Sequence, residues 1–267
     1  MTVPTYPYRK MSRNWRGRDF VVGDLHGCYS MLRRALSGIG FDETVDRLFS
    51  TGDLIDRGPE PLECLRLLEE PWFFAVVGNH ERMLRSRVGS GERLRTRVQA
   101  AFHSGEWLPA LSGTQRAELI RLAGLIGGMP GVLEVESGKN SFFVVHAQRP
   151  FIDRSPMSDV EFRSKGADST YLEATTWGRQ LFHVHASHIA SGLPLETGLV
   201  EIEPSDGERL TYVGHSIVKY PTRVGSHVFL DGGAYRKLRG EPGSLFIVEH
   251  AADEGPRVAY PTVACSS

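Results

Sequence analysis

Gly23-Asp24-Leu25-His26-Gly27 follows the short apolar run Asp19–Val22 and opens a series of three similar blocks. The other two are Gly52-Asp53-Leu54-Ile55-Asp56-Arg57-Gly58 and Gly78-Asn79-His80-Glu81, each again preceded by apolar residues. Carboxylates, imidazoles and an amide gathered in this way are the ligands that hard or borderline divalent ions prefer. Three such blocks in order therefore predict a two-metal phosphoester hydrolase.

The apolar runs before the three blocks predict strands at Asp19–Val22, Leu48–Thr51 and Trp72–Val77. Between them, apolar residues recur at helical spacing in two segments: Leu32, Ala35, Leu36 and Ile39 in the first, and Leu62, Leu65 and Leu68 in the second. A strand–helix–strand–helix–strand order favours parallel pairing of the three strands.

Two later apolar runs end in the same way. Phe142–Val145 leads into His146, and Leu210–Val213 leads into Gly214 and His215. Binding crevices of open α/β sheets form at the carboxyl ends of strands. We therefore expect the histidines to join the three blocks at one crevice, with glycines where the chain leaves the strands sharply.

The remaining segments give coarser predictions. Residues 80–126 look mostly helical, with a buried face of Leu119, Leu122, Ala123 and Ile126. Residues 150–207 are rich in Ser, Pro, Gly and charge and are expected to form excursions near the site. Further strands are expected at Val224–Leu230, Leu245–Val248 and Arg257–Tyr260. No domain boundary is evident, so residues 19–267 are predicted to form a single catalytic domain.

Composition narrows the class of protein. The 267 residues carry 31 basic and 32 acidic side chains, and this near-neutral balance argues against a dedicated nucleic-acid binder. Residues 1–18 are basic and are interpreted as a flexible, solvated arm. No apolar run is long enough for a membrane helix. The three cysteines show no CxxC spacing, which favours a reducing cytoplasm.

Taken together, GDLHG, GDLIDRG and GNHE, followed by His146, Trp177-Gly178-Arg179 and Gly214-His215, resemble the PPP family of metal-dependent serine/threonine protein phosphatases. The small bacterial and bacteriophage members are the most similar, and the resemblance spans roughly Phe20 to Val248. It implies an α/β fold of the calcineurin-like metallophosphoesterase type, with two mixed β-sheets flanked by helices. It also implies a phosphoprotein or phosphopeptide substrate.

The same resemblance implies a ligand set for two divalent ions. It gives Asp24 and His26 to one metal, gives Asn79, His146 and His215 to the other, and makes Asp53 the bridge. Mn²⁺ is the usual ion in bacterial relatives. Because no cysteine is among the ligands, Mg²⁺, Fe and Zn²⁺ also fit, and ligand type alone does not choose among them.

Catalytic roles follow from the chemistry of phosphoryl transfer. Arg57 and Arg179 are expected to bind the phosphate oxygens as planar, bidentate donors. His80 is expected to protonate the leaving alkoxide, while Asp56 fixes its tautomer and raises its pKa. The hypothesis is direct, in-line attack by metal-bound hydroxide, without a phosphoenzyme.

Several alternatives remain open at this level. A symmetrical diadenosine tetraphosphatase shares much of the motif set, although such relatives commonly lack the Asp of DRG and read GNHD. A non-catalytic phosphoprotein-binding scaffold is the rival from another class.

The roles of a few single residues also remain open. Asp231 is either a turn residue or a partner of a ligand histidine. His183, His185 and His188 have metal-like spacing but no accompanying carboxylate, and we expect them to be exposed non-ligands. Oligomeric state is not predicted.

Overall fold

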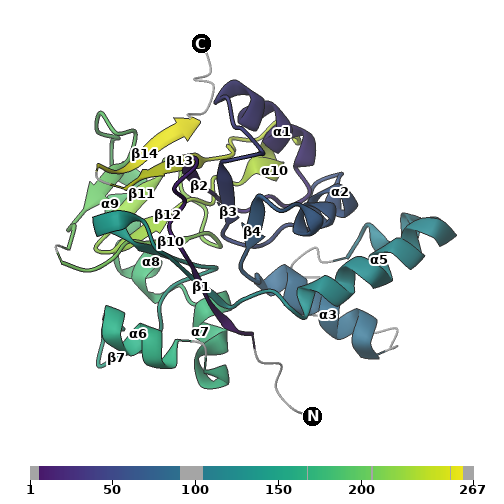
Figure 1. The fold of residues 1–267 in the computed structure, drawn as a ribbon, viewed down its shortest axis with the longest axis horizontal. Helices are drawn as coiled ribbons and strands as arrows, with labels where there is room; N and C mark the ends of the chain where they lie inside the picture. Colours follow the sequence, from purple (N-terminus) through teal and green to yellow (C-terminus); the bar gives the residue numbers. More distant parts are fainter. Residues whose placement is uncertain (1–5, 91–104, 167, 206, 253, 261–267) are drawn as a thin grey trace.

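Two β-sheets pack face to face, and helices cover the outside of the pair (Figure 1). The computed structural model describes residues 6–90, 105–166, 168–205, 207–252 and 254–260. Both sheets contain parallel and antiparallel pairs. The expected α/β fold with two mixed sheets is therefore confirmed.

The five-stranded sheet carries the three motif blocks. Its order is β14-β13-β2-β3-β4, with bounds Gly255–Tyr260, Ile247–Ala251, Asp19–Val22, Arg47–Ser50 and Phe73–Ala75. The strands β2, β3 and β4 are parallel, as the sequence predicts, and β13 runs antiparallel to β2. The three blocks consequently leave the same edge of the sheet.

The seven-stranded sheet carries the two later histidines. Its order is β1-β5-β6-β10-β12-β11-β9, with bounds Tyr8–Met11, Val132–Val135, Phe142–Val145, Thr211–Val213, His227–Phe229, Thr222–Val224 and Val200–Ile202. Its three middle strands β6, β10 and β12 are parallel. A separate hairpin pairs β7 (Phe151–Ile152) with β8 (Ser155–Pro156).

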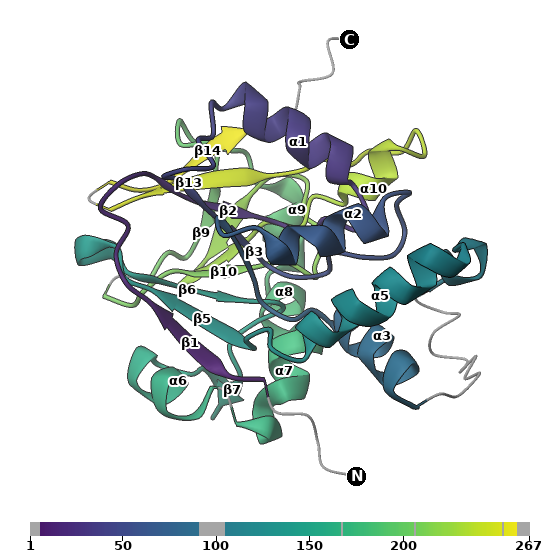
Figure 2. The same ribbon diagram turned by 45° about the vertical axis from the view of Figure 1, so that its right-hand side comes forward.

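Helices surround the two sheets (Figure 2). The α-helices are α1 (Tyr29–Gly38), α2 (Pro61–Arg66), α3 (Asn79–Ser90), α5 (Gly113–Ile126), α6 (Asp159–Lys165), α7 (Leu172–Trp177), α8 (Gln180–Val184), α9 (Ala186–Ser191) and α10 (Ala234–Lys237). Short 3₁₀ turns occur at Leu67–Glu69, Leu108–Ala110, Gly138–Asn140 and Ser169–Tyr171. Helices α3 and α5 lie side by side, and the predicted apolar face of α5 is buried.

Side-chain alternation on β2 explains how the layers are held together. Phe20 and Val22 face the core under the helices, whereas Val21 faces the core between the two sheets. Phe49 of β3 also lies between the sheets, with its ring stacked on Phe74 and edge-on to Phe142 of the opposite sheet. Each fully buried side chain of this size contributes about 1.5–3 kcal/mol. Burial on both faces explains the continuous apolar runs of β2 and β3.

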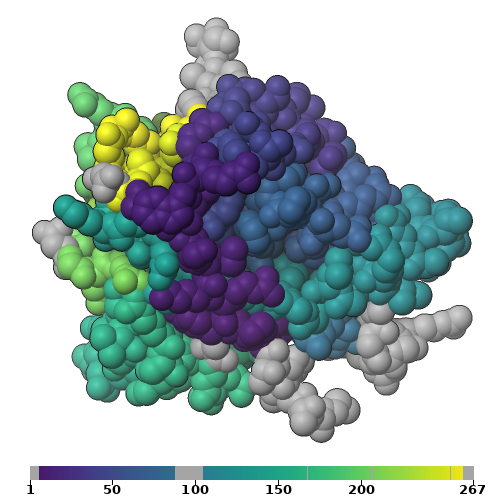
Figure 3. Space-filling model, in the orientation of Figure 1, coloured from purple at the N-terminus to yellow at the C-terminus, as the bar shows by residue number. Residues whose placement is uncertain are grey.

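The interpretation of residues 1–18 as a solvated arm is wrong for its described part. Tyr8–Met11 forms β1, paired in parallel with β5 at the edge of the seven-stranded sheet. The purple N-terminal segment lies across the front of the molecule (Figure 3). Two of its five basic residues form ion pairs: Lys10 contacts Glu136 at 2.7 Å and Arg18 contacts Asp46 at 2.7 Å. Residues 1–5 lie outside the described residues.

The segment expected to form one strand near residues 224–230 belongs to two strands. The segment Val224–Leu230 contains the end of β11 and the whole of β12, which pair antiparallel. The chain turns between them at Gly225, whose φ of 56° is in the left-handed region that glycine favours. The turn between the two strands carries little sequence signal other than that glycine. Residues 91–104, part of the expected helical region, lie outside the described residues.

Candidate metal centre

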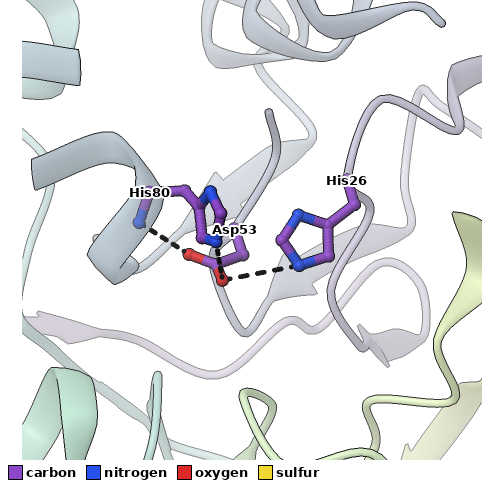
Figure 4. Close-up of side chains that lie close together, drawn as sticks. All are labelled: His26, Asp53 and His80. Atoms are coloured by element: carbon purple, nitrogen blue, oxygen red, sulfur yellow. Dashed lines mark hydrogen bonds and ion pairs between the residues drawn. The ribbon is translucent and has the colours of Figure 1, made fainter. Parts of the chain in front are cut away.

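Asp53 lies at the centre of the candidate site, just past the end of β3 (Figure 4). Its Oδ2 is 3.6 Å from Nε2 of His26, 3.8 Å from Nε2 of His80 and 3.5 Å from Nε2 of His146. Its Oδ1 accepts a hydrogen bond of 3.0 Å from the backbone N–H of His80. One carboxylate is thus surrounded by imidazoles from three separate strand ends.

The surrounding ligand atoms form two groups that share Asp53. His26, Asp53 and His80 make one group, and Asp53, His146 and His215 make the other, with ligand atoms in each within 4.8 Å of one another. All of these residues are buried. Asn79 joins the second group, since its Oδ1 is 2.9 Å from Nε2 of His146 and 3.1 Å from Nδ1 of His215.

The proton positions in the site fit bound cations. Nδ1 of His26 lies 2.9 Å from the carbonyl oxygen of Ile55, and Nδ1 of His146 lies 2.8 Å from that of Thr51. A carbonyl only accepts, so each Nδ1 carries the proton and each Nε2 presents a lone pair. The Nε2 lone pair of His146 faces oxygens of Asp53 and Asn79, an arrangement that is repulsive unless a cation lies between them. Nε2 of His26 faces Asp53 and the guanidinium of Arg57. The residues present therefore fit a pair of divalent metal ions.

Electrostatics agree with neutral histidine ligands in the second group. Burial lowers the pKa of His146 and of His215, with nearby positive charge from Arg179 acting in the same direction on both. For Asp53, burial alone would raise the pKa, but the imidazoles of His146, His80 and His26 reverse this and the net shift is downward. A carboxylate and neutral imidazoles are the protonation states that metal binding requires.

Asp24, the first predicted ligand, lies beside this centre and belongs to neither three-residue group. Its Oδ1 accepts from Thr51 Oγ1 at 2.9 Å, and its Oδ2 accepts from the backbone N–H of His215 at 2.9 Å. Burial, followed by Asp231 and Asp53, raises its pKa well above the usual range. Three buried carboxylates at one place are stabilised by a cation.

Asp231 has the first of the two roles that the sequence left open, that of a turn residue. Its Oδ1 accepts from the backbone N–H of Gly233 at 2.8 Å, which is a turn contact. Its Oδ2 is buried without a hydrogen-bond partner among the described residues. Burial raises the pKa of Asp231 to about 6. The negative charge of Asp231 raises the pKa of Asp24, so Asp231 also belongs to the surroundings of the centre.

His80 is held by Asp56 at the edge of the first group. The ring Nδ1 donates to Asp56 Oδ2 at 2.6 Å, which leaves Nε2 facing Asp53. Burial would lower the pKa of His80, but Asp53 and Asp56 outweigh it and the net shift is upward. His80 is therefore the imidazole of the site that is best able to carry and release a proton.

Two arginines approach the centre from different elements. Arg57 directs its guanidinium at Nε2 of His26, 2.8 Å away, and at Nε2 of His80, 3.3 Å away. Its carbon Cζ lies 4.9 Å from the ring centroid of Tyr235. Arg179, exposed between α7 and α8, donates to the carbonyl oxygen of His215 at 3.1 Å. The structure thus brings both predicted arginines to the site.

Backbone conformation is unusual at the site. The described part of the chain has eight non-glycine residues with positive φ, and five are candidate site residues: His26 (42°), Asp53 (48°), Asp56 (70°), Arg57 (68°) and His215 (62°). Such conformations cost about 1–3 kcal/mol each and persist where surrounding contacts enforce them. Their concentration here is typical of a functional centre.

Sequence reasoning gave no role to four residues that build the site. Glu81 is buried and accepts from three backbone N–H groups, those of Asp53, Leu54 and Gly78, at 2.8–3.0 Å. Thr51 contacts Asp24 and His146. Trp107 contacts Asp56, and the ring of Tyr235 stands edge-on to His26. Glu81 lies within a motif and could have been found there, whereas the other three have no local signal.

The histidines with metal-like spacing lie away from the centre. His183 and His188 are exposed on α8 and α9, and His185 is half-buried between these helices. The rings of His185 and His188 have centroids 6.5 Å apart, and among the described residues none of the three joins a ligand group. The expectation of non-ligands agrees with this placement.

Comparisons with known proteins agree with this geometry. The family model described as Calcineurin-like phosphoesterase matches residues 20–217, which is well over half of the chain. Serine/threonine-protein phosphatase 2 of Salmonella typhimurium is 32% identical over 216 residues, covering 81% of this chain and 87% of the relative. The chain therefore belongs to the calcineurin-like phosphoesterase family.

One further match bears on the choice within that family, and another bears on the fold. The symmetrical bis(5'-nucleosyl)-tetraphosphatase of Pasteurella multocida is 40% identical, but only over 92 residues, covering 33% of this chain and 34% of that protein. The solved structure of a candidate diadenosine tetraphosphatase superposes with a TM-score of 0.53 at 18% identity, covering 91% of this chain and 93% of that one. The latter similarity shows the fold alone.

A helix able to cross a membrane would need greater length and more apolar character than any helix in the described part of the chain has.

Proposed function

We propose that this protein is a metal-dependent serine/threonine protein phosphatase acting on phosphoprotein or phosphopeptide substrates. The observation that carries the proposal is the 2.6 Å contact between His80 and Asp56, which places a proton donor beside both ligand groups. A related protein phosphatase, similar over 81% of the chain, supports it. In this proposal the site residues and their metals would supply what phosphomonoester hydrolysis needs: charge neutralisation, phosphate binding and leaving-group protonation.

The proposal includes two divalent cations, Mn²⁺ first, with Mg²⁺, Fe and Zn²⁺ as alternatives. Asp53 would be shared, with Asp24 and His26 on one side and Asn79, His146 and His215 on the other. When bound, the cations would neutralise phosphate charge and lower the pKa of the attacking water. The amide of Asn79 suits this role because it adds no negative charge that would repel the substrate.

The arginines would bind the phosphate. Arg57 already places N–H groups 2.8 Å from Nε2 of His26 and 3.3 Å from Nε2 of His80, so its guanidinium faces the centre. Arg179 approaches from the exposed rim beside His215. A guanidinium offers paired N–H groups that match two phosphate oxygens, which fixes the substrate as well as attracting it.

His80 would donate a proton to the leaving oxygen. Asp56 holds Nδ1, so the proton that moves is the one on Nε2. The serine or threonine alkoxide is a poor leaving group and needs this proton as the P–O bond breaks. In-line attack without a phosphoenzyme would invert a chiral thiophosphate, and retention of configuration would contradict it.

The test is Mn²⁺-dependent hydrolysis of p-nitrophenyl phosphate and of a phosphoserine peptide. Activity should disappear with a chelator and with Asp53→Asn. The exposed Asp153 provides a matched control, because its φ of 48° equals that of Asp53 and Asp153→Asn leaves the site untouched. A folded wild-type protein without turnover across all four metals would favour a non-catalytic phosphoprotein-binding scaffold.

A second candidate is symmetrical diadenosine tetraphosphate hydrolysis. It is favoured by the local similarity to tetraphosphatases around the motif blocks. The presence of Asp56, held by His80, and of Glu81 in the third block argues for the protein phosphatase. The ratio of kcat/KM for a phosphoserine peptide to that for diadenosine tetraphosphate decides between them.

A further inference from the structure

Asp56 is held from the side opposite His80 by a segment that no motif includes. Its Oδ2 accepts a hydrogen bond from His80 Nδ1, and its Oδ1 accepts from the backbone N–H of Gly105 and from Nε1 of Trp107, each at 2.7 Å. These two residues are 49 and 51 positions away from Asp56 in the sequence. Asp56 is buried, so these contacts fix the plane of its carboxylate.

Three hydrogen bonds determine the orientation of this carboxylate. One oxygen bonded to His80 alone would leave the group free to rotate about its last bond. The Trp107 indole has a single polar hydrogen, and in this structure it goes to Asp56 rather than to solvent, although the ring is only half-buried. Gly105 reaches Oδ1 with φ at 70°, a conformation that glycine adopts without strain.

From this geometry we propose that Trp107, assisted by the N–H of Gly105, is a positioning residue that acts on His80 through Asp56. The inference rests on the proposed function, since it concerns the group that protonates the leaving oxygen. Trp107 itself does not need to touch substrate. By holding Oδ1 it keeps Oδ2 in line with His80 Nδ1, and so keeps Nε2 directed at the centre.

The competing interpretation is that Trp107 only packs against the hydrophobic core, where its ring does make contact. Trp107→Phe separates the two, because it keeps an aromatic ring and removes the N–H donor. Trp72→Phe is the matched control. Trp72 is also packed in that core, but its Nε1 is buried without a hydrogen-bond partner among the described residues.

The kinetic arm uses the full-length, Mn²⁺-loaded protein and two substrates. Trp107→Phe should lower kcat for a phosphoserine peptide about tenfold, with KM changed less than about twofold. For p-nitrophenyl phosphate, whose leaving group needs little protonation, kcat should fall less than about twofold. Trp72→Phe should leave kcat and KM for both substrates at their wild-type values. Equal losses on both substrates, or equal behaviour of the two variants, would overturn the inference.

The second arm needs neither metal nor turnover. The chain has four tryptophans, so its ¹H–¹⁵N spectrum has four indole N–H signals, and Trp107→Phe identifies one of them. That signal should lie downfield in the wild type and move upfield in Asp56→Asn, while the Trp72 signal stays in place. If the Trp107 signal has the same position in Asp56→Asn as in the wild type, the hydrogen bond between Trp107 and Asp56 is not formed, whatever the kinetic result.

The two experiments distinguish failure of the positioning role of Trp107 from failure of the proposed function. An active wild type whose Trp107→Phe variant behaves like Trp72→Phe removes the positioning role and leaves the proposed function standing. A wild type inert with every metal removes the proposed function and this role with it, even where the indole signal responds to Asp56→Asn. Urea unfolding of both tryptophan variants shows whether a loss of folded protein accounts for any change in rate.

Discussion

The two halves of the candidate site are built in different ways. The half from the five-stranded sheet comes from one continuous stretch, residues 24–81, in which three parallel strands each end in a motif block. The half from the seven-stranded sheet is gathered from His146, Arg179, His215 and Asp231, separated by helices and loops. The first half is therefore local in sequence, and the second depends on the whole fold.

The halves also differ in electrostatics. In the first, Asp53 and Asp56 outweigh burial and raise the pKa of His80. In the second, burial lowers the pKa of His146 and His215, and Arg179 adds to the effect. Burial also lowers the pKa of His26 in the first half, so His80 alone among these four imidazoles is favoured to hold a proton, and His26, His146 and His215 present neutral nitrogen lone pairs. Similar imidazoles acquire different roles from the charges beside them.

The two halves of the site approach each other closely at two glycines, Gly214 and Gly23. A Cβ at Gly214 would lie 1.8 Å from Oδ1 of Asp24, and a Cβ at Gly23 would lie 2.0 Å from the carbonyl oxygen of Leu230. Neither position has room for a side chain. With glycine there, the N–H of His215 reaches Asp24 directly. The shared carboxylate of Asp53 then lies between ligands from both sheets.

The largest effect is expected where the two halves share a residue. Asp53→Asn should lower kcat/KM at least about a thousandfold, equivalent to about 4 kcal/mol, because both ligand groups lose their common carboxylate. Metal content after desalting should fall for both ions. Loss of only one ion, measured by elemental analysis, would show that Asp53 serves a single half and would break the symmetry assumed here.

The difference between the halves also explains what could be predicted from sequence. The blocks around Asp24, Asp53 and Asn79 located β2, β3 and β4 and their parallel order, because each strand and its ligand are neighbours in the chain. The pairing of β1 with β5 joins residues more than a hundred positions apart, and no local pattern encodes it. The basic residues before Arg18 were therefore interpreted as an arm.

The same limit applies to the contacts around the catalytic residues. Asp56 and His80 could be predicted as a pair because both lie in motif blocks. The contact of Trp107 with Asp56 and that of Tyr235 with His26 depend on how distant loops return to the site. The positive φ of Asp56 and Arg57 is likewise imposed by tertiary contacts, since only a few per cent of non-glycine residues adopt it.

The next largest effect concerns the proton-donating half. His80→Asn should lower kcat on a phosphoserine peptide by about 10²–10³, since a positioned acid typically contributes this much. The loss on p-nitrophenyl phosphate should be smaller. Metal content should stay at the wild-type level, although His80 lies in a ligand group with His26 and Asp53. A variant that loses an ion together with its activity would make His80 a ligand rather than an acid.

The two arginines allow a direct comparison of the halves. Arg179→Ala should lower kcat/KM about 30- to 160-fold through weaker phosphate binding, as expected for a charged hydrogen bond worth about 2–3 kcal/mol. Arg57→Ala should lower kcat/KM further than Arg179→Ala does, because Arg57 also contacts His26 and His80. Competitive inhibition by inorganic phosphate measures binding separately. Unchanged phosphate affinity in Arg179→Ala would remove that residue from the phosphate site.

The smallest expected effect tests whether burial also lowers the pKa of a histidine outside the site. His250 of β13 is buried, accepts from Tyr212 Oη at 2.7 Å and donates to the carbonyl oxygen of Asn140, and burial lowers its pKa to about 4. Since its pKa in the unfolded chain is about 6.5, the unfolded state binds the proton first as pH falls. Stability is therefore lost between about pH 6.5 and pH 4.

His250→Gln keeps an acceptor for Tyr212 and a donor for Asn140 but cannot titrate. Urea unfolding at pH 7 and pH 5 should show that the variant loses about 2 kcal/mol less than the wild type over this interval. The remaining loss should persist in the variant, because buried His227, whose pKa burial lowers to about 3, titrates in the same direction. If wild type and variant lose the same stability, burial at His250 costs nothing, and the low pKa expected for His146 and His215 would need a cause other than burial.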